Sequence, residues 1–484
     1  MPVSNSIIEQ EPLYDQLPVG QEIIFVVSNQ DAVANETKVK FCAEVHISPT
    51  LQPNTSVGTD LIGTFKTTPN NAGVGIFDLR SIVENYVKAD NMAADGSQYK
   101  STVTDADNRH PIHLIDWFSL NNNTVRYMAL QFYVEYLGAD DGVNTVDPNI
   151  VRRAAGTSAN SNLFTLFNGY LKYTDELALF QGDFGYSLTD FFPDDNLSPS
   201  PAGSSKKFLT NAPKTQYANV NDYGTLALFQ KNQTQSDAIY RMEFTYYDSG
   251  GNDIGSEFIG KGTTTGAYTV WDTEVNKQLL FFGCFPANLQ NWSSTFQGLV
   301  SLGTILGGYY TIRFENAAGA NTMSIYTIQV KCPDNKGYES IRLCWLNQWG
   351  AWDYYTFTKK SIKTISTKGS TYTQLQGTWN DSVYTVDSYK GGKKSFRVNS
   401  TEKIKMNTDF VSEDDNVMFE ELINSPEVYL LNGFKTDNFT AFNTYVVPVR
   451  LTTSSFTRKT SVNDRLIQYT FEIEKTKTLR TQAV

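Results

Sequence analysis

Alternation of apolar and polar residues is the feature of this sequence that most constrains its fold. In "VKFCAEVHI" one face of an extended chain would carry only apolar side chains, those of Val39, Phe41, Ala43, Val45 and Ile47. The same period of two returns in "YRMEFTYY" (240–247) and "LIQYTFEIE" (466–474). A period of two is that of a β-strand with one buried face. We therefore predict an all-β fold of several antiparallel, β-sandwich-like domains.

The segments between these strands agree with that fold class. "DSGGND" (248–253) and "ENAAGANT" (315–322) predict hairpin turns. Pro448 lacks an amide proton, which predicts an edge strand or a bulge for "YVVPVRL". Only two short helices are predicted, from "FDLRSIVENYVKAD" (77–90), with Asp78 as its N-cap, and from "SEDDNVMFEELINSP" (412–426).

Three domains are predicted for the 484 residues, since a domain takes roughly 150 residues. They are an acidic β domain at 1–150, a central β domain at 163–365 and a carboxyl-terminal β domain with one helix at 379–484. Polar stretches at 152–162 and 366–378 would connect them.

Charge and cysteine content narrow the range of partners. Residues 1–150 hold 8 basic and 19 acidic residues, whereas residues 355–484 hold 18 basic and 14 acidic ones. This asymmetry would suit subunits that meet front to back; charged surface without such a role is the alternative. No strongly basic segment favours nucleic acid, and no apolar run is long enough for a membrane span.

The sequence leads us to expect a reducing compartment. Its opening lacks the pattern of a signal peptide, and four cysteines are too few for a disulfide framework. We therefore expect synthesis in a cytoplasm and free thiols, with a Cys332–Cys344 contact across a hairpin as the alternative.

Catalytic chemistry has little support in the sequence. The three histidines, His46, His110 and His113, accompany no hydrolase motif, and Cys42 lies about 13 Å along a strand from His46, too far to share a metal ion. We predict no enzyme, no catalytic, metal or cofactor-binding residue and no cofactor. Paired carboxylates for glycoside hydrolysis stay open, because their separation is a tertiary property.

An aromatic segment is the one candidate site. "IRLCWLNQWGAWDYYTFTKK" (341–360) alternates on both sides of a four-residue turn, with Asn347 first and Gly350 last. We interpret it as a β-hairpin whose aromatic side chains form a packing centre; a sugar-stacking platform, with Trp349 as its most exposed residue, is the alternative. The residues concerned are Trp345, Asn347, Trp349, Gly350, Trp352, Asp353, Tyr354 and Tyr355.

Three stretches carry a resemblance to a known class of proteins. They are "RLCWLNQWGAWDYYTFTKKS" (342–361), "TTPNNAGVGIFDLRSIVENYV" (67–87) and "DNVMFEELINSPEVYLL" (415–431) followed by "SVNDRLIQYTFEIEKTKTLRTQ" (461–482). Together they resemble virion structural proteins, of tail, neck or baseplate type, from tailed phages that infect Bacteroidetes and related aquatic bacteria.

The resemblance implies a structural subunit that is made in the host bacterial cytoplasm and resides in the virion. It would assemble as a ring-like homo-oligomer and contact other virion proteins. Long loops such as 89–110 would serve as arms that order on a neighbour. The alternative is a carbohydrate-binding receptor or tail-appendage protein that grips a surface glycan.

Overall fold

Strands dominate the computed structural model, which confirms the all-β class. The described residues are 5–13, 15–49, 53, 60–93, 111–121, 123–137, 151–153, 159–171, 206–229, 241–260, 279–315, 321–332, 337–431, 445–461 and 466–477. They form two compact units. Unit 1 comprises the described parts of Met1–Cys332 together with Leu346–Asp353, and unit 2 those of Pro333–Trp345, Tyr354–Asp437 and Ala441–Val484.

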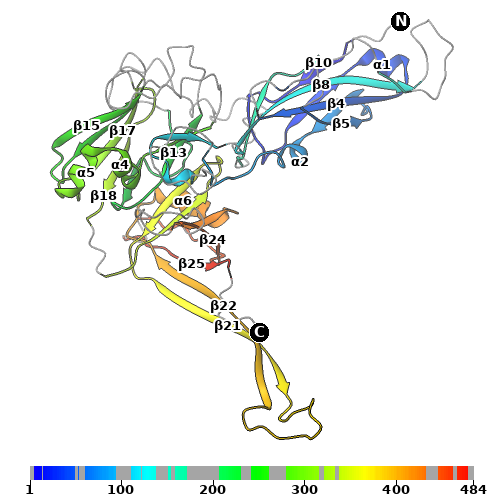
Figure 1. Ribbon diagram of the computed structural model, residues 1–484. Coiled ribbons are helices and arrows are strands. Elements are labelled where there is room, and N and C mark those ends of the chain that lie inside the picture. Colours follow the sequence, from blue (N-terminus) through cyan, green and yellow to red (C-terminus); the bar gives the residue numbers. More distant parts are fainter. Residues whose placement is uncertain are drawn as a thin grey trace. The chain divides into compact units, whose positions relative to one another are not determined.

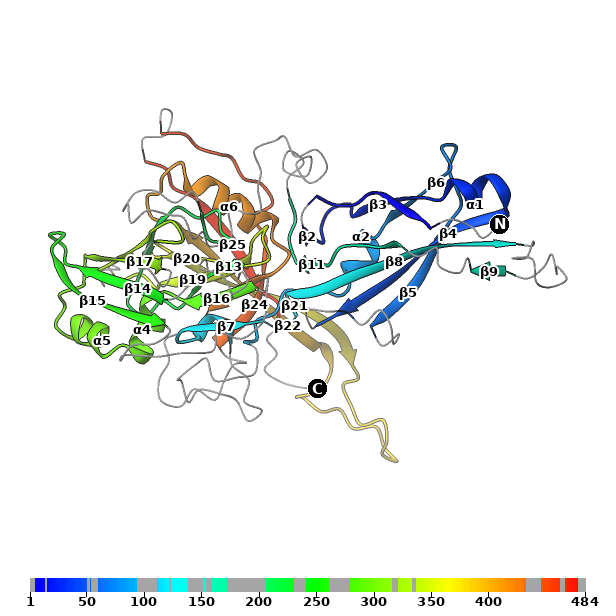
Figure 2. The ribbon, with the colours of Figure 1, turned by 90° about the horizontal axis from the view of Figure 1, so that it is seen from above.

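Unit 1 begins with a β-sandwich. Its smaller sheet has the order β1-β3-β6, with β1 at Ile7–Gln10, β3 at Ile24–Ser28 and β6 at Val74–Asp78. The larger sheet has the order β2-β11-β8-β4-β5, formed by Gln16–Pro18, Phe164–Phe167, Val125–Leu137, Thr37–Ser48 and Leu61–Thr67, and β9 (Val151–Arg153) and β10 (Ala159–Asn160) also pair with β8. Figure 2 shows β3 and β6 on one side of this sandwich and β8, β4 and β5 on the other.

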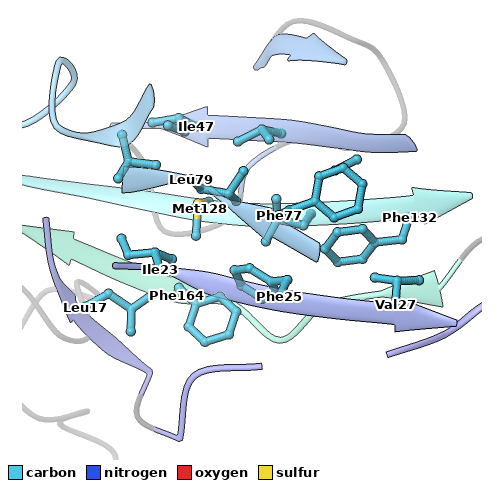
Figure 3. Close-up of a cluster of buried hydrophobic side chains, with 14 of the residues drawn as sticks. Leu17, Ile23, Phe25, Val27, Ile47, Phe77, Leu79, Met128, Phe132 and Phe164 are labelled. Carbon is cyan, nitrogen blue, oxygen red and sulfur yellow. The ribbon is translucent and has the colours of Figure 1, made fainter. Parts of the chain in front are cut away.

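Aromatic side chains fill the space between these two sheets. Phe25 and Phe77 of the smaller sheet contact Phe132 of the larger one, with ring centroids 5.6 and 5.7 Å apart, and Figure 3 shows them meeting. The predicted alternating face of β4, from Val39 to Ile47, is buried in this core. The period-two pattern therefore identified both the strand and its inner face.

The rest of unit 1 holds two further sheets and two helices. One sheet has the order β12-β18-β17-β14-β15, formed by Thr215–Ala218, Tyr326–Val330, Tyr309–Glu315, Arg241–Tyr247 and Asp253–Gly260. The other has the order β13-β16-β7, formed by Thr225–Phe229, Leu279–Gly283 and Phe118–Leu120. Helices α4 (Pro286–Trp292) and α5 (Ser294–Ser301) follow β16, and Phe296 of α5 contacts Tyr246 and Tyr310 of the larger sheet.

Unit 2 is built on one sheet with the order β20-β19-β23-β24-β25-β22-β21. Its strands are Trp352–Phe357, Ile341–Leu346, Val428–Leu431, Val446–Leu451, Thr470–Lys475, Gly392–Asn407 and Ile362–Gln374. The turn-side ends of the first two, Trp352–Asp353 and Leu346, belong to unit 1. Helix α6 (Asp415–Asn424) packs against the sheet through Phe419, whose ring lies 5.0 Å from Tyr355 and 5.4 Å from Phe471.

Several predicted elements differ from the observed ones. The predicted helix at 77–90 is only α2 (Arg80–Val83). Its N-cap is Leu79, so the prediction of Asp78 at this position was wrong, although Asp78 Oδ1 accepts from Arg80 N. Lys88 N donates to Asn123 O, so the chain has already left the helix at that residue. Helix α6 is confirmed, whereas α1 (Gln30–Asn35), α4, α5 and the 3-10 turn η1 (Ile112–Leu114) were not predicted.

Strand order also corrects two expectations. Pro448 lies in β24, which is an interior strand between β23 and β25, so the edge prediction was wrong. Proline is tolerated there because the pairing of β24 with β25 begins only at Val449. The pairs β2–β11 and β12–β18 are parallel, since no hairpin joins these distant segments. Strand β7, within the first predicted domain, pairs with β16 of the second, and the three-domain division stays a prediction.

Within the part of the chain that the structure describes, no helix is long and apolar enough to cross a membrane. All four cysteines are free thiols, as predicted.

Candidate functional site

The turn of the aromatic hairpin folds as its sequence predicts. Gly350 N donates to Asn347 O at 3.1 Å, which closes the four-residue turn. The Asn347 side-chain oxygen also accepts from Trp349 N at 3.0 Å and from Ala351 N at 3.1 Å. Gly350 takes a φ of +74°, which favours glycine. Asn347 and Gly350 are therefore structural residues whose types the turn requires.

The hairpin's tryptophans are buried, as expected of a packing centre. Trp345, Trp349 and Trp352 are only 0, 3 and 2 % exposed. Tyr354 is buried as well, and Tyr355 is half-buried. The expectation that Trp349 is the most exposed candidate for sugar stacking was wrong. The turn lies against another segment of unit 1, where Tyr170 N donates to Gln348 O at 2.7 Å.

Asp353 is the buried acid of this hairpin. Its Oδ1 accepts from Thr210 Oγ1 at 2.5 Å, while Asn347 Nδ2 donates to Leu209 O at 2.8 Å. Burial raises the pKa of the Asp353 carboxyl to about 7, and the Thr210 and Asn347 hydrogen bonds act in the opposite direction. The turn and residues 209–210 of unit 1 are thus joined by a buried polar cluster. We assign this cluster a structural role.

Substitution of Gly350 by Ala tests how tightly this turn is held. A Cβ at Gly350 would lie 2.3 Å from Asn168 O, so the new methyl group collides with backbone as well as straining a positive φ. At Gly251 the φ is +82° but nothing lies within 4 Å. We expect Gly251→Ala to lower the free energy of unfolding by roughly 1–2 kcal/mol and Gly350→Ala by about 1 kcal/mol more. Equal losses in urea denaturation would show that residues 168–170 do not confine the turn.

An acidic pair, Glu243 on β14 and Glu315 on β17, lies beside two arginines. Glu315 accepts from Arg241 Nε at 2.6 Å and from Arg313 Nη2 at 2.8 Å. Burial raises the pKa of Glu243, and a side-chain hydrogen bond to Glu315 adds to the shift. Among the described residues, no group of three or more His, Cys, Asp or Glu could hold a metal ion.

A long two-stranded ribbon of unit 2 is the candidate interaction surface. We call residues 362–407 the arm; they comprise β21, the connecting segment 375–391 and β22. The stretch 366–378, predicted as a linker, is largely strand β21. Backbone pairing of β22 with β25 covers Lys403–Asn407. Between Gly392 and Glu402, β21 is the one strand that pairs with β22 in the described segments. Figure 1 shows the two strands running out past β24 and β25.

The arm exposes an unusual share of apolar side chains. Of the 22 large hydrophobic residues exposed in the described segments, eleven fall within residues 362–398. Trp379 is 81 % exposed and Tyr389 is 73 % exposed, both in the connecting segment. The others are Ile362, Ile365, Tyr372, Leu375, Val383, Tyr384, Val386, Phe396 and Val398. Exposed apolar surface of this kind marks interaction sites in soluble proteins.

Two sequence signals could have identified the arm. No proline occurs between Pro333 and Pro426, although linkers and loops usually contain it. Threonine, isoleucine and tyrosine, which favour strands, recur through "IKTISTKGSTYT". The predicted loop arm at 89–110 lies outside the described residues from 94 onward, as does His110.

Comparisons with known proteins assign no family to the chain. No protein-family model and no curated protein matches it. Among solved structures, it is similar to E. coli alpha-2-macroglobulin in its native conformation, with 8% sequence identity and a TM-score of 0.15. The similarity covers 84% of this chain and 22% of that one, so the chain spans about a fifth of that protein's length. A likeness this weak carries no argument about fold or function.

Proposed function

We propose that this protein is a non-enzymatic structural subunit of a tailed-phage virion, in the tail, neck or baseplate, that assembles into a homo-oligomer through its arm. The observation that carries the proposal is the arm's exposed apolar surface. Its location in the virion rests on the sequence resemblance, and with it the contact with other virion proteins and synthesis in the host cytoplasm.

The low stability expected of the arm in an isolated chain supports an assembly role. A two-stranded hairpin is marginally stable by itself, and three strands or packing against another element are needed for independent stability. Between Gly392 and Glu402, β22 has backbone pairing to one strand only among the described residues. A neighbouring subunit would supply the missing packing and cover the exposed aromatic side chains.

The experiment is mass measurement by light scattering, followed by negative-stain imaging of the purified full chain. We expect closed rings of uniform size. The double variant Trp379→Ser/Tyr389→Ser should raise the dissociation constant at least about tenfold, because large aromatic side chains dominate interface energetics. Leu302→Ser is the matched control, since Leu302 is 80 % exposed but lies outside the arm. If the Trp379→Ser/Tyr389→Ser variant assembles as the parent does, the proposal is contradicted.

A monodisperse monomer at every concentration would favour the alternative, a carbohydrate-binding tail appendage. For this function the candidate for sugar stacking would be Trp379, which is 81 % exposed, and not the buried Trp349. Asn380 and Asp381 follow Trp379 in the sequence. Binding to a bacterial surface glycan that Trp379→Ser abolishes and Leu302→Ser preserves would establish that function instead.

A further inference from the structure

The outer face of the sheet β1-β3-β6 is a second exposed apolar surface. Phe25, Val27 and Phe77 point into the sandwich core, so the residues that alternate with them point outward. Val26 pairs directly with Ile76, and Ser28 pairs with both Val74 and Ile7. We call Ile7, Ile24, Val26, Val74 and Ile76 the aliphatic face. Ile7 is 58 % exposed and Ile76 is 50 % exposed.

Carboxylates flank the aliphatic face. Glu9 lies on it, because its carboxylate accepts a hydrogen bond from Ser28 Oγ at 2.5 Å. Asp78 pairs with Ile24 across the sheet. The surrounding sequence has the same sign, with 19 acidic and 8 basic residues in 1–150. This face therefore offers apolar contact in a negative field.

The arm presents the complementary surface. In the β21–β22 register, Lys368 pairs with Asn399, Ser370 with Arg397 and Tyr372 with Lys394, and residues of even number in β21 share one side of the ribbon. Phe396, the extra residue of the bulge, contacts the Tyr372 ring at 6.3 Å. We call Lys368, Tyr372, Lys394, Phe396 and Arg397 the basic face. Residues 362–407 carry 8 basic and 3 acidic residues.

We infer that the basic face of one copy docks on the aliphatic face of a second copy. The inference rests on the proposed function and names the partner of the arm. Cationic and aromatic side chains on the arm would meet carboxylate and aliphatic side chains on the sheet. The contact is heterologous, because the basic face of one copy meets a different surface, the aliphatic face, on the next copy. Repetition of a heterologous contact generates a ring when the rotation closes.

Nucleic acid is the competing partner for a basic ribbon. It leaves the aliphatic face without a role, whereas a second copy supplies an apolar partner for Tyr372 and Phe396, the two exposed rings of the basic face. A chain with a net charge of −11 also repels a polyanion at long range. The combination of apolar and opposite-charge complementarity favours a second copy of this chain.

Charge exchange between the two faces tests the inference. The arm variant is Lys368→Glu/Arg397→Glu, and the face variant is Glu9→Lys/Ile76→Lys; these side chains are exposed in the isolated chain. Each variant alone should raise the self-dissociation constant about tenfold or more in sedimentation velocity. An equimolar mixture of the two should recover assembly, because each contact then joins opposite charges. Lys393→Glu, on the other side of the ribbon, is the matched control.

Each outcome bears on a different claim. Recovery in the mixture requires folded chains and supports the contact. Loss of assembly in the arm variant with full assembly in the face variant would overturn this contact and leave the proposed function standing. A parent chain that never self-associates would overturn both. Binding of a DNA duplex, measured by fluorescence anisotropy and lost on Arg397→Glu while self-association is unchanged, would assign the basic face to nucleic acid.

Discussion

Replacement of Trp352 by Ala should lower the free energy of unfolding by roughly 3–5 kcal/mol, because a buried tryptophan leaves a large cavity when it is truncated. Trp352 is 2 % exposed, and its ring lies 5.2 Å from that of His113 in an edge-on arrangement. Urea denaturation followed by tryptophan fluorescence gives the measurement.

The matched control is Trp379→Ala, the same substitution at a side chain that is 81 % exposed. In dilute protein it should change the unfolding free energy by no more than about 0.5 kcal/mol, as is usual for surface positions. Similar losses in the two variants would mean that Trp352 is not part of a packed core. The comparison therefore separates a packing role of the hairpin from a role of its aromatic rings at the surface.

Asp353→Asn should change how stability depends on pH. The folded-state pKa of about 7 lies above the ordinary value of 3.8, so the folded chain keeps a proton that the unfolded chain has released. The favourable contribution of this group is complete below about pH 4 and is lost as the pH rises through 7. By linkage, the loss amounts to roughly 4 kcal/mol. Asparagine has no proton to lose, so the variant should gain about that much relative to the parent between pH 4 and pH 8.

The difference between parent and variant isolates this carboxyl from the others. Urea midpoints would be measured at pH 4, 6 and 8 for both chains, with Asp381→Asn on the exposed arm as the control. A constant difference across this range would show that Asp353 is ionised in the folded chain at pH 4 as it is at pH 8. The buried cluster would then need a positive partner for the carboxylate.

Local patterns predicted the parts of the fold that local physics determines. Alternation located β4, β14 and β25 with their buried faces, because a strand with one buried face must repeat every two residues. Asn347 and Gly350 identified the hairpin turn, because the turn needs a side-chain acceptor first and a positive φ last. The aromatic hairpin was thus predicted as a structural element.

Burial of the turn depends on residues that are distant in the sequence. Trp349 is covered although it stands at a turn, a position that is normally exposed, because the turn meets residues 168–170 of unit 1. The pKa of Asp353 likewise depends on its burial beside Thr210, which is 143 residues away. Neither contact leaves a pattern in the sequence around the hairpin.

The arm was not predicted as strands, because it lacks the pattern that burial of one face imposes on a strand. Its strands have two exposed sides, so the alternation of apolar and polar residues that marks a half-buried strand is absent from 362–374. Abundant Ser, Thr, Lys and Gly then suggested a linker. Only the lack of proline and the strand-favouring residues pointed to the ribbon that the structure contains.

Unit 1 combines chain segments that are separated in the sequence, and this determines when it can finish folding during synthesis. Strand β2 needs β11, which ends at Phe167, and the unit further includes Leu346–Asp353. At roughly 5–20 residues per second, a ribosome needs about 20–70 s to reach Asp353. Until then, Tyr170 N, Leu209 O and Thr210 Oγ1 lack the hydrogen-bond partners that the hairpin supplies. A fragment cut after Cys332 would keep that gap permanently, so unit 1 cannot be obtained whole by truncating the chain at its apparent boundary.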